Sequence, residues 1–210
     1  ACQAAGAEID GMRAGSIGVA AGFSLHPLKN LNVWGDGGVI TTQSEDLDKK
    51  LRLLRNHGLK NRDEIETFGY NSRLDTLQAV VGTWLLPNLD RINEARIRVA
   101  ARYNSGLQHV VKVPPRSKNI KSVFHLYFLI VTKRDELLAY LQSNGIEAKV
   151  HYPIPLHLQK ASRALGYQRG DFPVCERQCR DAISLPMHQH LSDEQIDYVV
   201  HKIQEFYQVN

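Results

Sequence analysis

The stretch F-S-L-H-P-L-K-N-L-N-V-W-G-D-G-G, from Phe23 to Gly38, carries a single lysine among apolar and uncharged polar residues, followed by a glycine-rich turn. No other charged residue lies between Phe23 and Gly35. Pro27 disfavours a helical backbone for the residue before it, so we expect the chain to reach Lys29 in an extended or turned conformation. A lone amine in such surroundings is a candidate for a lowered pKa and for nucleophilic chemistry. Composition alone leaves an ordinary surface lysine as the alternative.

Four further blocks accompany this stretch. They are Cys2 to Ala7 (C-Q-A-A-G-A), Arg55 to Gly58 (R-N-H-G), Gly69 to Asp75 (G-Y-N-S-R-L-D) and His151 to His157 (H-Y-P-I-P-L-H). Together with Ser24 to Lys29 and the glycine turn, the blocks resemble, in order and over nearly the whole chain, the DegT/DnrJ/EryC1/StrS family of pyridoxal-phosphate-dependent sugar aminotransferases. One block would be weak evidence, whereas five in register are strong.

The resemblance implies an α/β fold, that of the fold-type I aminotransferases. Residues 1–105 would be the C-terminal part of the large domain that binds pyridoxal phosphate, with a long interdomain helix. Residues 106–210 would be the small C-terminal α+β domain. It also implies a C-terminal fragment, because the aspartate that the family places at the pyridine nitrogen would fall just before Ala1. We therefore expect the 210-residue chain by itself to be inactive.

The resemblance also assigns site residues. Lys29 would hold pyridoxal 5'-phosphate as a Schiff base and later shuttle the proton. Ser24 would bind the cofactor phosphate and Gln3 would lie by the cofactor ring, although a strand-end serine bonded to backbone and a loop glutamine are the alternatives. Asn71 would cross the interface of a homodimer to the partner subunit's cofactor phosphate. For Arg73, a structural ion pair is the alternative to any role in the site.

The proline-rich block near residue 151 would lie at the mouth of the active site in the family. His151 and Tyr152 would then contact the sugar, unless the prolines simply shape a rigid loop. The implied reaction is transamination of a keto sugar, nucleotide-linked, with glutamate as the amino donor. Two alternatives stay open: a sugar dehydratase, in which the lysine position is a histidine, and a non-catalytic regulatory or binding protein on the same fold. Lys29 favours transamination over dehydration.

Hydrophobic patterning predicts the surrounding elements. Ile17 to Ser24 has the small apolar composition of a buried strand. Ser44 begins a helix that ends near His57. A long helical stretch from Leu74 to about Tyr103 should break or kink at Pro87. A strand is predicted over 123–131, and His125 within it is expected to be a core histidine. A helix over 134–144, a strand over 146–150 and a final helix after the capping box of Ser192 to Gln195 are also predicted.

Composition excludes several classes of protein. The formal charge of +4 comes from scattered basic residues, without the basic block and interleaved aromatics that indicate nucleic-acid binding. No apolar run approaches the ~20 residues of a membrane span. Three cysteines and no secretory signal indicate the cytoplasm. Cys175 and Cys179 match no recurrent zinc spacing, so we expect packing thiols and no metal.

Overall fold

The computed structural model describes residues 1–115 and 117–209. The chain forms two compact units, one of residues 1–94 with 117–125 and one of residues 95–116 with 126–210. Both units mix helices and strands, as expected for the predicted α/β fold class. The predicted division at residue 105 into a large-domain part and a small domain stays a prediction.

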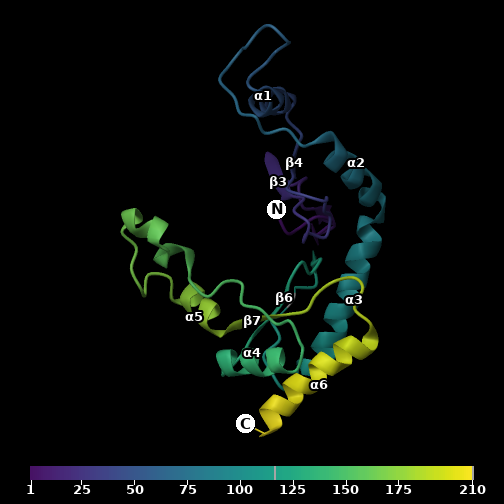
Figure 1. Cartoon of the computed structure of the whole chain (residues 1–210), viewed down its shortest axis with the longest axis vertical. Coiled ribbons are helices and arrows are strands. Elements are labelled where there is room, and N and C mark those ends of the chain that lie inside the picture. The colour runs from purple at the N-terminus through teal and green to yellow at the C-terminus, as the bar shows by residue number, and fades with distance from the viewer. Residues whose placement is uncertain (116, 210) are drawn as a thin grey trace. The chain divides into compact units, whose positions relative to one another are not determined.

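The first unit contains two small antiparallel sheets. In one, β1 (Glu8–Ile9) lies between β2 (Met12–Arg13) and β5 (Ile120–Lys121). In the other, β3 (Ala20–Ser24) pairs with β4 (Gly38–Thr42), and Ser24 lies opposite Gly38. The loop between β3 and β4 therefore holds Lys29, and Figure 1 shows these two strands side by side.

The prediction of a buried strand over residues 17–24 is wrong for its first half. The strand begins at Ala20, and the side chains of Ile17 and Val19 are 54% and 76% exposed. Among the strands that the structure describes, β3 has only β4 as a neighbour, so its other edge and much of its surface are uncovered. Small apolar residues predicted the strand correctly but could not show what covers it.

Three helices of the first unit follow their sequence signals. The helix α1 (Glu45–Arg55) begins after Ser44, whose Oγ accepts a hydrogen bond from the Leu47 amide. The helix α2 (Thr76–Leu85) begins after Asp75, whose carboxylate accepts from the Leu77 amide. Pro87 lies in the 3-10 turn η1 (Leu86–Asn88) that separates α2 from α3 (Leu89–Leu107), which confirms the predicted break. Helix α3 belongs to the first unit up to Glu94 and then continues into the second.

The second unit is built around an antiparallel pair, β6 (Tyr127–Ile130) and β7 (Ala182–Leu185). The helices α4 (Arg134–Ser143) and α6 (Asp193–Val209) pack against each other. Between α4 and β7 the chain forms the 3-10 turns η2 (Leu156–Leu158) and η3 (Lys160–Leu165) and the helix α5 (Pro173–Asp181). Figure 1 shows this segment, which includes the labelled helix α5, in green.

Two predicted strands of this region are shorter than expected. Of residues 123–131, only Tyr127–Ile130 form a strand, because Phe124 has a positive φ of 45° that interrupts the extended backbone. Residues 146–150 form no strand, although Lys149 makes an isolated bridge to Ser184 at the edge of β7. Alternation of apolar and charged residues predicted an extended segment there, but a continuous ladder does not form.

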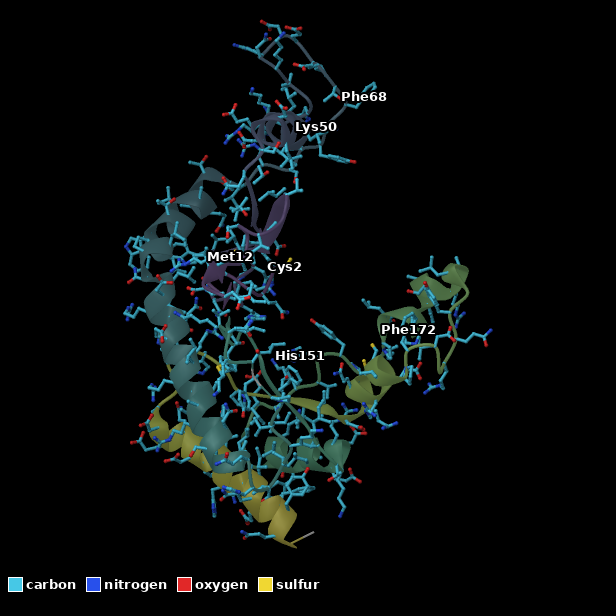
Figure 2. The ribbon with its side chains drawn as sticks, turned by 180° about the vertical axis from the view of Figure 1, so that it is seen from behind. Cys2, Met12, Lys50, Phe68, His151 and Phe172 are labelled. Carbon is cyan, nitrogen blue, oxygen red and sulfur yellow. The ribbon has the colours of Figure 1, made fainter. Side chains whose placement is uncertain are left out.

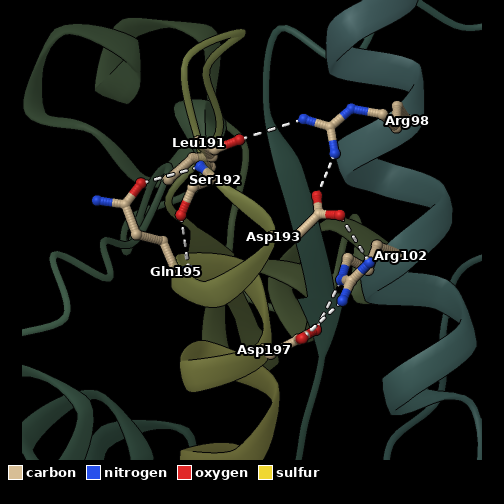
Figure 3. Close-up of polar contacts among 7 residues, drawn as sticks. All are labelled: Arg98, Arg102, Leu191, Ser192, Asp193, Gln195 and Asp197. Atoms are coloured by element: carbon tan, nitrogen blue, oxygen red, sulfur yellow. Dashed lines mark hydrogen bonds and ion pairs between the residues drawn. The ribbon is translucent and has the colours of Figure 1, made fainter.

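Helices α3 and α6 pack closely at one point and are linked by ion pairs. A Cβ atom at Gly106 would lie 2.6 Å from Val200 Cγ1, so glycine is required for this approach. Figure 3 shows Arg98 and Arg102 of α3 reaching Asp193 of α6, with Arg102 also paired to Asp197 at 2.6 Å. Figure 3 also shows the predicted capping box, in which Ser192 and Gln195 exchange hydrogen bonds.

Candidate active site

The loop that carries Lys29 is folded by its own backbone. The Leu25 amide donates to the Gly37 carbonyl at 2.8 Å, and the Val33 amide donates to the Leu25 carbonyl at 2.9 Å. Both Leu25 and Val33 are buried. A Cβ at Gly37 would lie 2.8 Å from Leu74 Cδ1, so the glycine turn lets the loop pack against the start of α2. The Lys29 amide donates to the His26 carbonyl, which forms the turn expected after His26-Pro27.

Asn30, the residue after Lys29, fastens this loop to two other segments. Its side-chain amide donates to Asn93 Oδ1 of α3 and to the Val123 carbonyl, both at 2.8 Å. Asn93 in turn donates to the Ala5 carbonyl at 2.9 Å. Asn30 and Asn93 are only 5% and 1% exposed. The network therefore joins the N-terminal block, the lysine loop, α3 and the segment before His125 through buried hydrogen bonds, which fix geometry strongly.

We expect Asn93→Leu to destabilise the protein by about 1–3 kcal/mol, because it removes one acceptor and one donor and leaves the Asn30 amide and the Ala5 carbonyl without these partners. Urea unfolding followed by circular dichroism measures this change. Asn88→Leu, at a less buried position of η1 whose recorded side-chain hydrogen bond comes from Arg91, is the matched control. Equal stability of the two variants would show that the network does not hold the loop.

The recorded polar neighbour of the Lys29 amine is a histidine and not a carboxylate. Among the described residues, no carboxylate lies within ion-pair distance of Lys29 Nζ, whereas Lys60, Lys121, Lys149 and Lys202 each pair with a glutamate. The half-buried Lys29 amine instead lies 3.4 Å from His125 Nε2. An amine held without a counter-ion remains available to react with a carbonyl group, which is not true of a surface ion pair.

His125 is predicted from the sequence to be a satisfied core histidine rather than a catalyst, and the structure shows which side chain it contacts. The side chain is half-buried, and it is the recorded polar partner of Lys29 although 96 residues separate the two in sequence. Nothing in the spacing of the two residues could show this. The signal that could have pointed to it is a lone histidine within an otherwise apolar segment.

Ser24 lies at the end of β3, five residues before Lys29 and on the same loop. Its Oγ accepts a hydrogen bond from the His26 amide at 3.3 Å, so the alternative of a serine bonded to backbone is present. Accepting this bond leaves the hydroxyl hydrogen free to donate to a ligand oxygen. The geometry is thus compatible with both readings of Ser24.

Gln3 and Asn71 are both exposed, and neither is recorded in contact with Lys29 within the described part of the chain. Gln3 lies in the N-terminal block whose Ala5 carbonyl is held by Asn93. Asn71 makes an isolated bridge to Asn56 at the end of α1. Arg73 donates to the Asn56 side chain at 3.1 Å, and no ion pair of Arg73 is recorded among the described residues.

His151 and Tyr152 belong to the second unit. His151 Nδ1 lies 2.9 Å from the hydroxyl of buried Ser184 on β7. Burial, together with the nearby Lys149 charge, lowers the pKa of His151 below its usual value. Tyr152 is exposed and lines a mostly apolar groove of about 490 Å³ with Ile154, Leu156 and Phe172.

The groove is anchored by a contact that sequence reasoning missed. His157 Nε2 lies 3.0 Å from Glu176 Oε1, and the same oxygen accepts the Gly170 amide at 2.7 Å. The Gly170 hydrogen bond and the His157 contact lower the pKa of Glu176. Cys175 and Cys179 of α5 also line the groove as free thiols. Within residues 1–115 and 117–209, no group of three or more potential metal ligands comes together.

A model of the DegT/DnrJ/EryC1/StrS aminotransferase family matches residues 1–204. The chain belongs to this family. The resemblance carried by the five blocks is thereby confirmed. No helix in the described part of this family member is long and apolar enough to cross a membrane.

Relatives of this family member span several named roles. A pleiotropic regulatory protein of Geobacillus stearothermophilus is 44% identical over 99% of this chain and 57% of its own length. A dTDP-3-amino-3,4,6-trideoxy-alpha-D-glucose transaminase of Streptomyces venezuelae is 38% identical over 98% of this chain and 55% of its own length. The crystal structure of S. venezuelae DesV in complex with a ketimine intermediate matches with a TM-score of 0.95 and 38% identity, over 99% of this chain and 56% of that one. The chain thus spans just over half the length of these relatives.

The residues of this loop fit the cofactor of the family. A pyridoxal phosphate site needs an amine for the aldehyde and hydrogen-bond donors for the phosphate. One loop supplies both, since the Lys29 amine has no carboxylate partner among the described residues and the Ser24 hydroxyl retains a donor. The buried Asn30 Oδ1 has no recorded hydrogen-bond donor in the described structure. The loop therefore also offers a hydrogen-bond acceptor that the described residues leave unpaired.

Proposed function

We propose that the protein carrying this chain is a sugar aminotransferase that uses pyridoxal 5'-phosphate. The observation that carries the proposal is the Lys29 amine, which lies on a hydrogen-bonded loop and has no carboxylate partner among the described residues. The chain that holds this amine belongs to an aminotransferase family. The transaminase relative and the DesV structure, similar over nearly the whole chain, support it.

The bound cofactor supplies the electron sink that stabilises negative charge at the substrate carbon. Lys29 would bind covalently to the cofactor aldehyde in the resting state. With its amine free, Lys29 would act as the general base that takes a proton from the substrate carbon and as the acid that later returns it.

Three further residues would hold the cofactor. Ser24 would donate its hydroxyl hydrogen to the phosphate, and Gln3 would lie beside the ring. Asn71 of the partner subunit would reach the same phosphate through its side-chain amide. Ser24 and Lys29 are five residues apart on one loop, which supports an arrangement in which one loop binds both ends of the cofactor.

The amino donor in this proposal is glutamate, and the acceptor is a keto sugar linked to a nucleotide. The name of the S. venezuelae relative, a dTDP-sugar transaminase, supports a nucleotide carrier. His151 and Tyr152 would contact the sugar. Ser184 orients the His151 ring by its 2.9 Å contact with Nδ1, and Tyr152 is 69% exposed and therefore accessible to a ligand.

A homodimer with shared active sites is part of the proposal. The exposed face of α2 presents Leu77, Val80 and Trp84, and the loop before α2 presents Phe68, which is 96% exposed and labelled in Figure 2. Apolar side chains gathered at one surface favour a protein interface. Asn71 lies between Phe68 and α2 in the sequence and is exposed, so its side chain is accessible to a partner subunit. The three free cysteines support a cytoplasmic location.

A spectroscopic assay tests the function. We expect the complete gene product, loaded with pyridoxal phosphate, to absorb in the visible region, to lose that absorbance on addition of glutamate and to release 2-oxoglutarate. Absorbance should return when a nucleotide-linked keto sugar is added. Aspartate in place of glutamate, and the keto sugar without glutamate, are the matched controls. Glutamate without any spectral effect would reject glutamate as the donor.

A regulatory protein without catalysis is the second candidate, favoured by the name of the G. stearothermophilus relative. Under that alternative the protein would neither absorb in the visible region with pyridoxal phosphate nor exchange nitrogen between substrates. The same assay therefore separates the two functions. Spectral change with turnover supports the aminotransferase, and its absence with a folded dimer supports the regulator.

A further inference from the structure

We propose that His125 is the positioning residue of the Lys29 amine, and that its Nε2 accepts a hydrogen bond from Nζ whenever Lys29 is not bound to the cofactor. This inference rests on the proposed function. It assigns a role to a histidine that the sequence placed in an apolar core. The direct observation is the 3.4 Å distance between the two nitrogens.

The chemistry of the two groups decides the direction of the hydrogen bond. Lys29 Nζ has three N–H donors as an ammonium and two as a free amine, so it can donate to His125 Nε2 in either state when that ring nitrogen carries no proton. Because Lys29 has no carboxylate within ion-pair distance among the described residues, this imidazole is the group that limits the movement of a long flexible side chain. Without it, the four-carbon stem would sample many rotamers.

A second contact, independent of the first, fixes His125 opposite Lys29. The residue after Lys29, Asn30, donates to the carbonyl of Val123, two residues before His125, at 2.8 Å. Asn30 is buried and is also held by Asn93. Lys29 thus contacts His125, and Asn30 contacts Val123. These two contacts set how the lysine loop aligns with the segment that contains Val123 and His125. The contact of Lys29 with His125 is therefore imposed by a buried anchor and does not depend on the lysine side chain alone.

The consequence lies in the step that forms the bond between Lys29 and the cofactor. An amine held in one place attacks a carbonyl faster than a mobile one, because orientation contributes to the rate. A hydrogen bond to a charged group is strong enough to change a rate by tenfold or more. At 3.4 Å the bond is long, so we expect about tenfold.

The test measures how fast pyridoxal phosphate added to the cofactor-free, complete protein produces visible absorbance. We expect His125→Leu to lower this rate constant about tenfold. His125→Gln retains an oxygen acceptor and should remain within about threefold of the parent. Pyridoxamine 5'-phosphate has no aldehyde and cannot bond to Lys29, so its affinity should be unchanged in both variants. His109→Leu, at an exposed histidine, is the matched control.

The outcomes separate the inference from the proposed function. A rate in His125→Leu within twofold of the parent would overturn the inference. A matching loss of pyridoxamine phosphate affinity, or a Gln variant as slow as the Leu variant, would also overturn it, because either result indicates a role in packing. If the parent itself forms no visible absorbance, the proposed function fails and the inference fails with it.

Discussion

We expect Lys29→Ala, in the complete gene product, to abolish covalent attachment of pyridoxal phosphate and to lower kcat by at least about 10³-fold. Proton transfer by one positioned group contributes about 10²–10⁴-fold, and Lys29 would also lose its role in holding the cofactor. The loss should appear as absent visible absorbance after incubation with the cofactor and as absent 2-oxoglutarate release. Lys29→Arg should behave similarly, because a guanidinium does not deprotonate to attack an aldehyde.

Two matched variants make this test specific. Lys60→Ala and Lys149→Ala remove lysines that pair with Glu64 and Glu147 and that lie on exposed surface. Both should retain absorbance and turnover. Retention of covalent cofactor in Lys29→Ala would contradict the assignment of the amine, whatever the activity of the other variants.

Asn71→Ala should weaken cofactor retention by about 1.5–3 kcal/mol, the contribution of a hydrogen bond to a charged group, which is roughly 10- to 150-fold in affinity. The reason is that Asn71 would bind the phosphate held by the partner subunit. Equilibrium dialysis of pyridoxal phosphate measures the effect. Ser72→Ala, at the neighbouring exposed position, is the matched control and should leave the affinity unchanged.

Mixing inactive subunits tests whether the site is shared. In a heterodimer of Asn71→Ala and Lys29→Ala subunits, one of the two sites would regain both residues, and some activity should return. Each variant alone should stay weak or inactive under the same conditions. Verified subunit exchange without recovered activity would show that Asn71 acts within its own subunit or not at all.

Local sequence signals predicted the helices well because each signal acts through neighbouring residues. Ser44 caps α1, Pro87 falls in the 3-10 turn between α2 and α3, and Ser192 with Gln195 forms the capping box of α6. Such features depend on a few residues of backbone geometry and hydrogen bonding. They do not depend on what lies far away in the chain.

Features that depend on distant residues were harder to predict. Apolar residues over 17–24 predicted a strand but not that Ile17 and Val19 would be exposed, because burial depends on neighbouring strands. The contact of Lys29 with His125 joins segments 96 residues apart, and the Asn30 anchor that aligns them is an ordinary asparagine in sequence. The resemblance to the family located Lys29, whereas only the structure revealed its partner.

The most direct test of the central claim is to find the residue that carries the cofactor. Borohydride reduces a carbon–nitrogen double bond to a stable amine, so treatment of the cofactor-loaded protein fixes the cofactor to its lysine. Digestion and mass spectrometry then locate the modified peptide. We predict that the label lies on Lys29, within the peptide that contains Ser24 and Asn30. A label on another lysine, or a fully loaded protein without any label, would contradict the account.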